Sequence, residues 1–326
     1  MPSPPVERDI LAMIGNTPML QLTGFDTGPC DLFLKMESQN PGGSIKDRMG
    51  LAMVQAAEAS GALRPGGTVI EATAGNTGIA LGLVTIARGY RLVLVIPDKM
   101  SEEKIAHARA LGAEIHMTRS DVSKGDPEFF QDIAARLETE IPGSVWVNQF
   151  TNPANAQAHE ATTGPEIWEQ MEHDADAVVC AVGSGGTLAG LSRHFARVQP
   201  HLEMVLADPQ GSVLAGFVET GEIGTPGPSV VEGIGSGQIP PLADFSRVRE
   251  AFTIPDSESL ETTRALLRRK GILAGTSSGT LVAAALRYCR QQRQPKRVVT
   301  FICDSGNKYL SKVFNDAWMQ ERGFSL

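Results

Sequence analysis

The chain has 326 residues, of which 42% are hydrophobic and 20% charged, and its net charge is −8. This length suits one large or two medium globular domains, and the acidic balance without a basic stripe disfavours nucleic acid as a partner. The longest apolar run, residues 79–87, is too short to cross a bilayer, and residues 1–8 lack the features of a signal peptide. Four cysteines without a C-x-x-C pattern and six histidines without ligand spacing disfavour disulfides and a metal site. We expect a cytoplasmic protein that binds no metal, nucleic acid or membrane.

In chain order, apolar runs alternate with amphipathic segments. After a short helix at 10–14 and a short strand at 19–22, we expect longer strands at 31–35, 68–71, 92–96, 114–117, 175–182, 204–207 and 297–303. Helices are expected at 45–59, 79–88, 101–111, 127–140, 188–198, 257–270, 280–290 and 308–319. Continuous apolar strands that alternate with helices predict an α/β fold with mostly parallel sheets covered on both faces.

A stretch rich in Pro, Gly and Asn at 142–155 marks the expected domain boundary. We therefore expect an N-terminal α/β domain at 1–148 and a C-terminal α/β domain at 149–326, with residues 1–40 able to pack on the other domain. The Gly/Pro-rich stretch 211–241 has little periodicity, and long connections of this kind in compact domains are often functional.

Residues 40–48, Asn-Pro-Gly-Gly-Ser-Ile-Lys-Asp-Arg, predict a sharp turn that opens a helix. Ser44 is a suitable N-cap, and Asp47 three residues later can complete a capping box. Lys46 then lies in the first helical turn, where the helix dipole disfavours a cation. It can be an ordinary surface lysine. Alternatively, the positive local field and partial burial lower its pKa, so that a neutral amine is ready to form a Schiff base with an aldehyde cofactor.

The loop Gly183-Ser184-Gly185-Gly186-Thr187 follows a buried strand and precedes a helix, so its N–H groups can bind a phosphate. One alternative is a dinucleotide site that uses Asp208 at the end of the next strand, but Leu188 stands where the third glycine belongs. The other alternative is a tight turn without a ligand.

Three more segments carry polar groups at helix starts or strand ends. Residues 73–78, Thr-Ala-Gly-Asn-Thr-Gly, suit a small carboxylate or form a plain helix start, and in 275–279 a serine can be a simple N-cap. Gln149 ends an apolar strand and can bond a ligand or the backbone. Nothing pairs His159 with a nucleophile, so we interpret it as a structural histidine.

Taken together and in order, these motifs resemble the cysteine synthase / cystathionine β-synthase family of fold type II pyridoxal-phosphate enzymes. The matching segments are 40–48, 73–78, 149–155, 183–187, 232–235 (Glu-Gly-Ile-Gly) and 275–279, and the resemblance covers residues 8–322. It implies two open, mostly parallel sheets with helices on both faces, as in the tryptophan synthase β subunit, with pyridoxal 5'-phosphate as the cofactor and a homodimeric assembly.

By this resemblance, Lys46 is the Schiff-base lysine and moves the α-proton of the substrate. The resemblance also implies that the glycine loop at 183–187 binds the cofactor phosphate. It implies that Asn76 bonds the pyridoxal 3-oxygen and that Ser277 faces the pyridine nitrogen. A serine hydroxyl cannot hold a proton on that nitrogen as a carboxylate would, which favours β-elimination over transamination. The substrate-binding residues by the same resemblance are Thr73, Ala74, Gly75, Thr77, Gln149 and, at the entrance, Gly235. Many members carry Ser where this chain has Ala74, so one hydroxyl near the substrate is missing.

The resemblance implies a β-replacement in which L-serine, or an O-activated serine, exchanges its β-substituent for a thiol. Segments 208–212 and 308–319 look like cystathionine β-synthases, which use homocysteine, whereas 164–168 and 304–306 look like cysteine synthases, which use sulfide. We expect homocysteine and L-cystathionine, with O-acetylserine plus sulfide giving L-cysteine as the alternative. An NAD-dependent oxidoreductase and a non-catalytic binding protein are the alternatives of a different class. Many cystathionine β-synthases continue beyond the equivalent of residue 326 into a regulatory domain, so we expect either a truncated or a stand-alone form.

Overall fold

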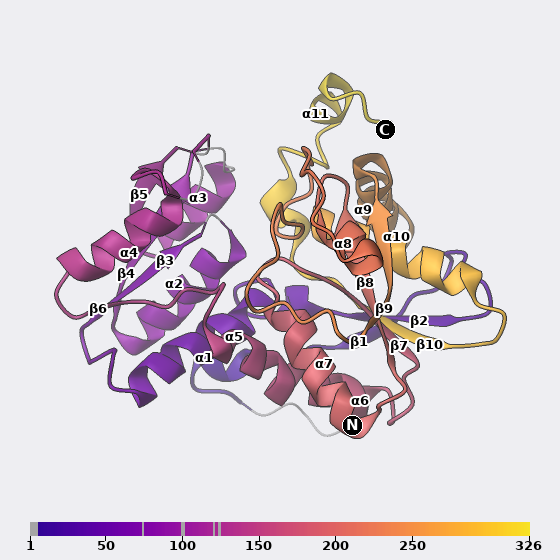
Figure 1. Cartoon of the computed structure of the whole chain (residues 1–326), viewed down its shortest axis with the longest axis horizontal. Helices are drawn as coiled ribbons and strands as arrows, with labels where there is room; N and C mark the ends of the chain where they lie inside the picture. The colour runs from indigo at the N-terminus through magenta and orange to yellow at the C-terminus, as the bar shows by residue number, and fades with distance from the viewer. Residues whose placement is uncertain (1–5, 74, 99–101, 120, 123–124) are drawn as a thin grey trace. The chain divides into compact units, whose positions relative to one another are not determined.

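The computed structural model describes residues 6–73, 75–98, 102–119, 121–122 and 125–326. The chain divides into two compact units (Figure 1). Unit 1 comprises residues 1–16 and 40–155, and unit 2 comprises residues 17–39 and 156–326. The chain passes from unit 1 to unit 2 within the helix α5 (Pro153–Ala158).

The described part of unit 1 contains a parallel sheet in the order β5-β4-β3-β6. Its strands are β3 (Thr68–Ala72), β4 (Arg91–Pro97), β5 (Glu114–Thr118) and β6 (Ser144–Trp146). Its helices are η1 (Ile10–Met13), α1 (Lys46–Ala59), α2 (Asn76–Arg88), α3 (Glu102–Ala110) and α4 (Phe130–Glu140).

Alternate residues of the strands of unit 1 supply two hydrophobic cores. Val69 and Leu94 pack with Met53 of α1 and Leu81 of α2 on one face. Their neighbours along the strands, such as Ile70, pack against α4 on the other face. Both faces are therefore covered by helices, which is why the central strands β3 and β4 are mostly apolar.

Unit 2 is built on a six-stranded sheet in the order β1-β2-β10-β7-β8-β9, in which only the β1–β2 pair is antiparallel within the described residues. Its strands are β1 (Met19–Gln21), β2 (Asp31–Lys35), β7 (Ala177–Ala181), β8 (Glu203–Pro209), β9 (Val248–Ile254) and β10 (Arg297–Phe301). The helical segments are η2 (Glu37–Gln39), the π-helical η3 (His159–Thr163), α6 (Gly164–Gln170), α7 (Gly186–Val198), α8 (Leu214–Thr220), α9 (Asp256–Lys270), α10 (Thr276–Gln291), η4 (Gly306–Tyr309) and α11 (Asp316–Glu321).

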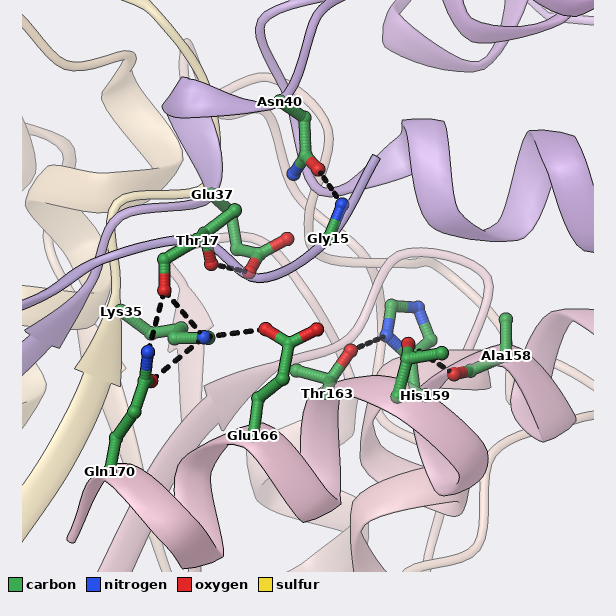
Figure 2. Close-up of polar contacts among 11 residues, drawn as sticks. Gly15, Thr17, Lys35, Glu37, Asn40, Ala158, His159, Thr163, Glu166 and Gln170 are labelled. Atoms are coloured by element: carbon green, nitrogen blue, oxygen red, sulfur yellow. Dashed lines mark hydrogen bonds and ion pairs between the residues drawn. The ribbon is translucent and has the colours of Figure 1, made fainter. Parts of the chain in front are cut away.

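A buried lysine ties the N-terminal strands to the rest of unit 2 (Figure 2). The side chain of Lys35, the last residue of β2, is fully buried, and its ammonium group donates three hydrogen bonds. The acceptors are Thr17 O at 2.8 Å, Glu166 Oε2 at 2.6 Å and Gln170 Oε1 at 2.8 Å. These bonds use all three donors of the ammonium group, so α6, β2 and the segment before β1 are held together.

The structure confirms the predicted fold class of two mostly parallel sheets with helices around them. The predicted helix at 308–319 is wrong. The chain forms η4, a turn, and then α11, because the Asn315 side chain accepts from Ala317 N and Trp318 N and starts a new helix. The stretch 211–241 contains the short helix α8 and is otherwise irregular, and β9 after it was not predicted.

Candidate functional site

In unit 1, Lys46 is the first residue of α1 and is half-buried. Its N–H donates to Ser44 Oγ at 3.2 Å, but the Asp47 carboxylate accepts from Gly42 N–H instead of completing a capping box with Ser44. A Cβ at Gly42 would lie 2.5 Å from Asp47 Oδ1. The turn before Lys46 is therefore closed by a charge-assisted bond that requires a glycine.

The loop at residues 73–78 joins the end of β3 to α2. Thr73 N donates to Val95 O at 3.1 Å, and Gly75 N donates to Thr73 Oγ1 at 3.4 Å. Asn76 begins α2, whose first N–H groups have no acceptor within the helix. The predicted substrate residue Ala74 lies outside the described residues.

Gln149 and Thr77, which are 72 positions apart, lie within hydrogen-bonding distance of each other. Thr77 Oγ1 donates to Gln149 Oε1 at 2.8 Å, and the Asn155 amide donates to Gln149 O at 2.8 Å. Both Thr77 and Gln149 are buried. The amide of Gln149 therefore has a fixed backbone and a hydroxyl partner.

Sequence reasoning missed Glu71, whose side chain is completely buried beneath this loop. Its carboxylate accepts from Gln149 N at 3.2 Å and from Gln149 Nε2 at 3.5 Å. Burial raises the pKa of Glu71 to about 8. Hydrogen bonds from Gln149, Ala72 and Asn148 lower this pKa but do not offset the effect of burial. An acidic residue inside the apolar run 68–72 was the available signal in the sequence.

In unit 2, the glycine loop leads from β7 into α7, a helix of 13 residues. Gly185 has φ +94°, and a Cβ there would lie 2.5 Å from Ala243 N. A Cβ at Gly183 would lie 2.5 Å from Gly233 O. Both positions therefore require glycine, and they lie at the start of α7, where the first N–H groups have no acceptor within the helix.

His159 supports this loop from η3, in agreement with its interpretation as a structural histidine. The buried ring lies 2.9 Å from Thr163 Oγ1 through Nδ1 (Figure 2) and 3.2 Å from Thr187 Oγ1 through Nε2. The histidine thus holds the hydroxyl of the last residue of the loop.

Ser277 lies in the first turn of α10 and is buried, and its hydroxyl makes no hydrogen bond within the described chain. Glu232 N donates to Thr276 Oγ1 at 3.3 Å, and Gly235 N donates to Val182 O at 2.8 Å. Residues 232–235 therefore connect the glycine loop with the Ser277 turn, so unit 2 brings three of the predicted segments together.

The residues of each unit fit the parts of pyridoxal phosphate that the family resemblance assigns to them. The glycine loop is a cradle that side chains would fill, at the positive end of a helix, as a phosphate requires. Ser277 offers a neutral hydroxyl, which suits an unprotonated pyridine nitrogen. Lys46 is half-buried and supplies an amine from the first residue of α1, whose backbone N–H is held by Ser44.

Comparisons with known proteins point the same way. A family profile described as "Pyridoxal-phosphate dependent enzyme" matches residues 10–304. Cystathionine beta-synthase of Apis mellifera is 40% identical over 320 residues, which are 97% of this chain and 63% of that protein. Cysteine synthase 1 of Neurospora crassa is 40% identical over 324 residues, which are 97% of this chain and 86% of that protein.

Among solved structures, the O-acetylserine dependent cystathionine beta-synthase from Helicobacter pylori aligns with a TM-score of 0.86 and 35% identity. The alignment covers 94% of this chain and 98% of that one. The chain spans only 63% of the length of the honeybee protein, so it matches a part of that longer relative. In the part of the chain that the structure describes, no helix is long and apolar enough to cross a membrane.

Proposed function

Because the chain belongs to the family of pyridoxal-phosphate dependent enzymes, we propose that it catalyses a β-replacement on L-serine or an O-activated serine. The incoming nucleophile is a thiol, with homocysteine preferred, and the product is then L-cystathionine. The relatives called cystathionine beta-synthase and the H. pylori structure support this choice.

Bound pyridoxal phosphate supplies an electron sink for the charge that develops when the α-proton of an amino acid leaves. Lys46 would hold the cofactor through its Nζ, and its free amine would take that proton as a general base. The bond from its backbone N–H to Ser44 Oγ fixes where the side chain leaves the beginning of α1.

The substrate carboxylate binds to unit 1, at Thr73, Gly75, Thr77 and Gln149. The N-terminus of α2 provides the positive partial charge for this anion. Asn76 would orient the ring by a hydrogen bond to its 3-oxygen.

In unit 2, the loop from Gly183 to Thr187 would hold the phosphate, Ser277 would offer its hydroxyl to the ring nitrogen, and Gly235 would line the substrate entrance. The observation that carries the proposal is the strict glycine requirement at Gly183 and Gly185 in front of a long helix. An ordinary turn does not need two glycines packed against backbone at an anion-binding helix start.

Cysteine synthesis from O-acetylserine and sulfide is the second candidate, since cysteine synthase 1 of N. crassa has the same identity to this chain as the honeybee protein. The experiment is turnover of the purified holoenzyme with serine or O-acetylserine, each with homocysteine or sulfide. We expect cystathionine to form at the higher kcat/KM. Sulfide turnover without homocysteine turnover would overturn the preference for homocysteine, and failure of all four pairs would overturn β-replacement.

We further propose that the protein is a cytoplasmic homodimer. Support for the dimer comes from the family resemblance, and the four thiols without a disulfide are typical of a reducing compartment. Analytical ultracentrifugation should give a mass near twice the 34.8 kDa of one chain. A monomer at micromolar concentration would contradict the dimer.

A further inference from the structure

We infer that Glu71 is a positioning residue for substrate binding: through the Gln149 amide it sets whether Thr77 offers its hydroxyl proton to the substrate carboxylate. The inference rests on the proposed function, because it assumes that a carboxylate binds at the loop of residues 73–78. It adds a residue that neither the motifs nor the relatives assign.

The three side chains form one chain of hydrogen bonds with a direction. Thr77 Oγ1 donates to Gln149 Oε1 at 2.8 Å, and Gln149 Nε2 faces Glu71 Oε1 at 3.5 Å. In this arrangement Glu71 is the final acceptor, which is the role of an ionised carboxylate. The hydroxyl proton of Thr77 is then committed to Gln149 and cannot be donated to a substrate.

Protonation of Glu71 reverses this direction. A neutral carboxyl group donates through its own O–H, so the Gln149 amide turns by half a rotation and presents Oε1 to Glu71. Its NH2 group then donates to Thr77 Oγ1, and the Thr77 proton becomes available to a substrate carboxylate. The backbone of Gln149 need not move, because Glu71 and Asn155 hold its N–H and C=O.

The environment of Glu71 allows both states near neutral pH, since burial raises its pKa to about 8. Glu71 pairs with Leu94 in the sheet and shares the face that α1 and α2 cover. The charged residues of α1 are Lys46, Asp47 and Arg48 at its beginning and Glu58 near its end. The charged residue of α2 is Arg88 at its end. On the neighbouring strands, the sole charged residue is Arg91 at the start of β4, which pairs with Glu114 at the surface.

The state with protonated Glu71, in which Thr77 can donate to a substrate carboxylate, is therefore populated below pH 8 and lost above it. An affinity that needs the protonated state falls with the protonated fraction, which decreases about tenfold between pH 7 and pH 9 for a pKa of about 8. A ligand without a carboxylate does not need the Thr77 proton and escapes this loss.

The test is the binding of L-alanine to the holoenzyme between pH 7 and pH 9, followed by cofactor absorbance. L-Alanine has the carboxylate but no β-substituent to lose, and L-alaninamide is the matched ligand without the charge. Wild type should lose about tenfold more affinity for L-alanine across this range than Glu71→Gln, which mimics the protonated state permanently. The titration of the ligand amine affects both proteins equally, so it cancels when their affinities are compared. The affinity for L-alaninamide should depend on pH in the same way in both proteins.

A second variant covers the case in which Glu71→Gln does not fold. Thr77→Val removes the hydroxyl, so its L-alanine profile should also lack the additional tenfold loss. Wild type and either variant with parallel L-alanine profiles would overturn the inference alone. A wild-type holoenzyme whose absorbance responds to no amino acid would overturn the proposed function and this inference with it.

Discussion

Replacement of Glu71 by Gln should change how the stability of the fold depends on pH. The carboxyl group is fully buried at the end of β3, and its contacts are N–H donors of Gln149 and the neighbouring backbone. Gln fills the same volume but has no proton to lose. The variant therefore removes one titration from the folded state and little else.

The sign follows from the direction of the shift. Burial raises the pKa of Glu71 from its ordinary 4.5 to about 8, so the folded protein keeps a proton that the unfolded chain has already lost. The contribution to stability is fully present below the unfolded pKa and is lost as the pH rises through the folded pKa. Each pH unit inside this window costs about 1.4 kcal/mol, so between pH 6 and pH 8 the loss is roughly 2 kcal/mol.

The assay is urea unfolding of the holoenzyme at pH 6, 7 and 8 with saturating cofactor, followed by tryptophan fluorescence. Wild type should lose about 2 kcal/mol more than Glu71→Gln between pH 6 and pH 8. The exposed change Glu219→Gln, which also removes one negative charge, should behave like wild type. Parallel pH profiles for wild type and Glu71→Gln would refute the reasoning, because Glu71 would then titrate alike in both states.

Three further changes test other parts of the account. Gly185→Ala places a Cβ 2.5 Å from Ala243 N at a residue with φ +94°, so it should weaken cofactor binding about tenfold, as measured by equilibrium dialysis. The control Gly216→Ala, whose Cβ would have no atom within 4 Å, should bind the cofactor like wild type. Equal affinities of the two variants would contradict phosphate binding by the glycine loop. Lys35→Met removes the buried ammonium donor shared by Thr17 O, Glu166 Oε2 and Gln170 Oε1, and it should cost about 3 kcal/mol in denaturant unfolding. Arg119→Ala at an exposed ion pair should change stability little, and an equally small loss in both variants would contradict the buried network. Gln149→Leu should raise KM for the amino-acid donor about tenfold with a smaller change in the KM of the thiol, and the reverse pattern would remove Gln149 from the carboxylate site.

Much of the fold could be predicted because its signals are local. The buried strands β3, β4 and β8 are continuous apolar runs, and the helices that follow β3 and β7 open with glycine-containing loops. The prediction was wrong at 308–319, where apolar periodicity continued across a position at which Asn315 begins a separate helix.

Pairings between residues far apart in the sequence could not be predicted. The strand β2 pairs with β10, and the paired residues Asp31 and Arg297 are 266 positions apart in the sequence. This pairing places residues 17–39 in unit 2. Glu71 could be noticed as an acid in an apolar run, but its link to Gln149 depends on β6 lying beside β3. The positions of Lys46, Thr77, Gly183 and Ser277 at helix starts were predictable, whereas the bonds that hold their turns were not.

The central claim is that Lys46 carries the cofactor, and chemical trapping tests it most directly. The yellow holoenzyme is reduced with borohydride, digested and mapped by mass spectrometry, with Lys46→Arg as the matched control. We expect the pyridoxyl group on the peptide containing Lys46 in wild type and on no peptide in the variant. Label on another lysine, or an equal yield of label in Lys46→Arg, would contradict it.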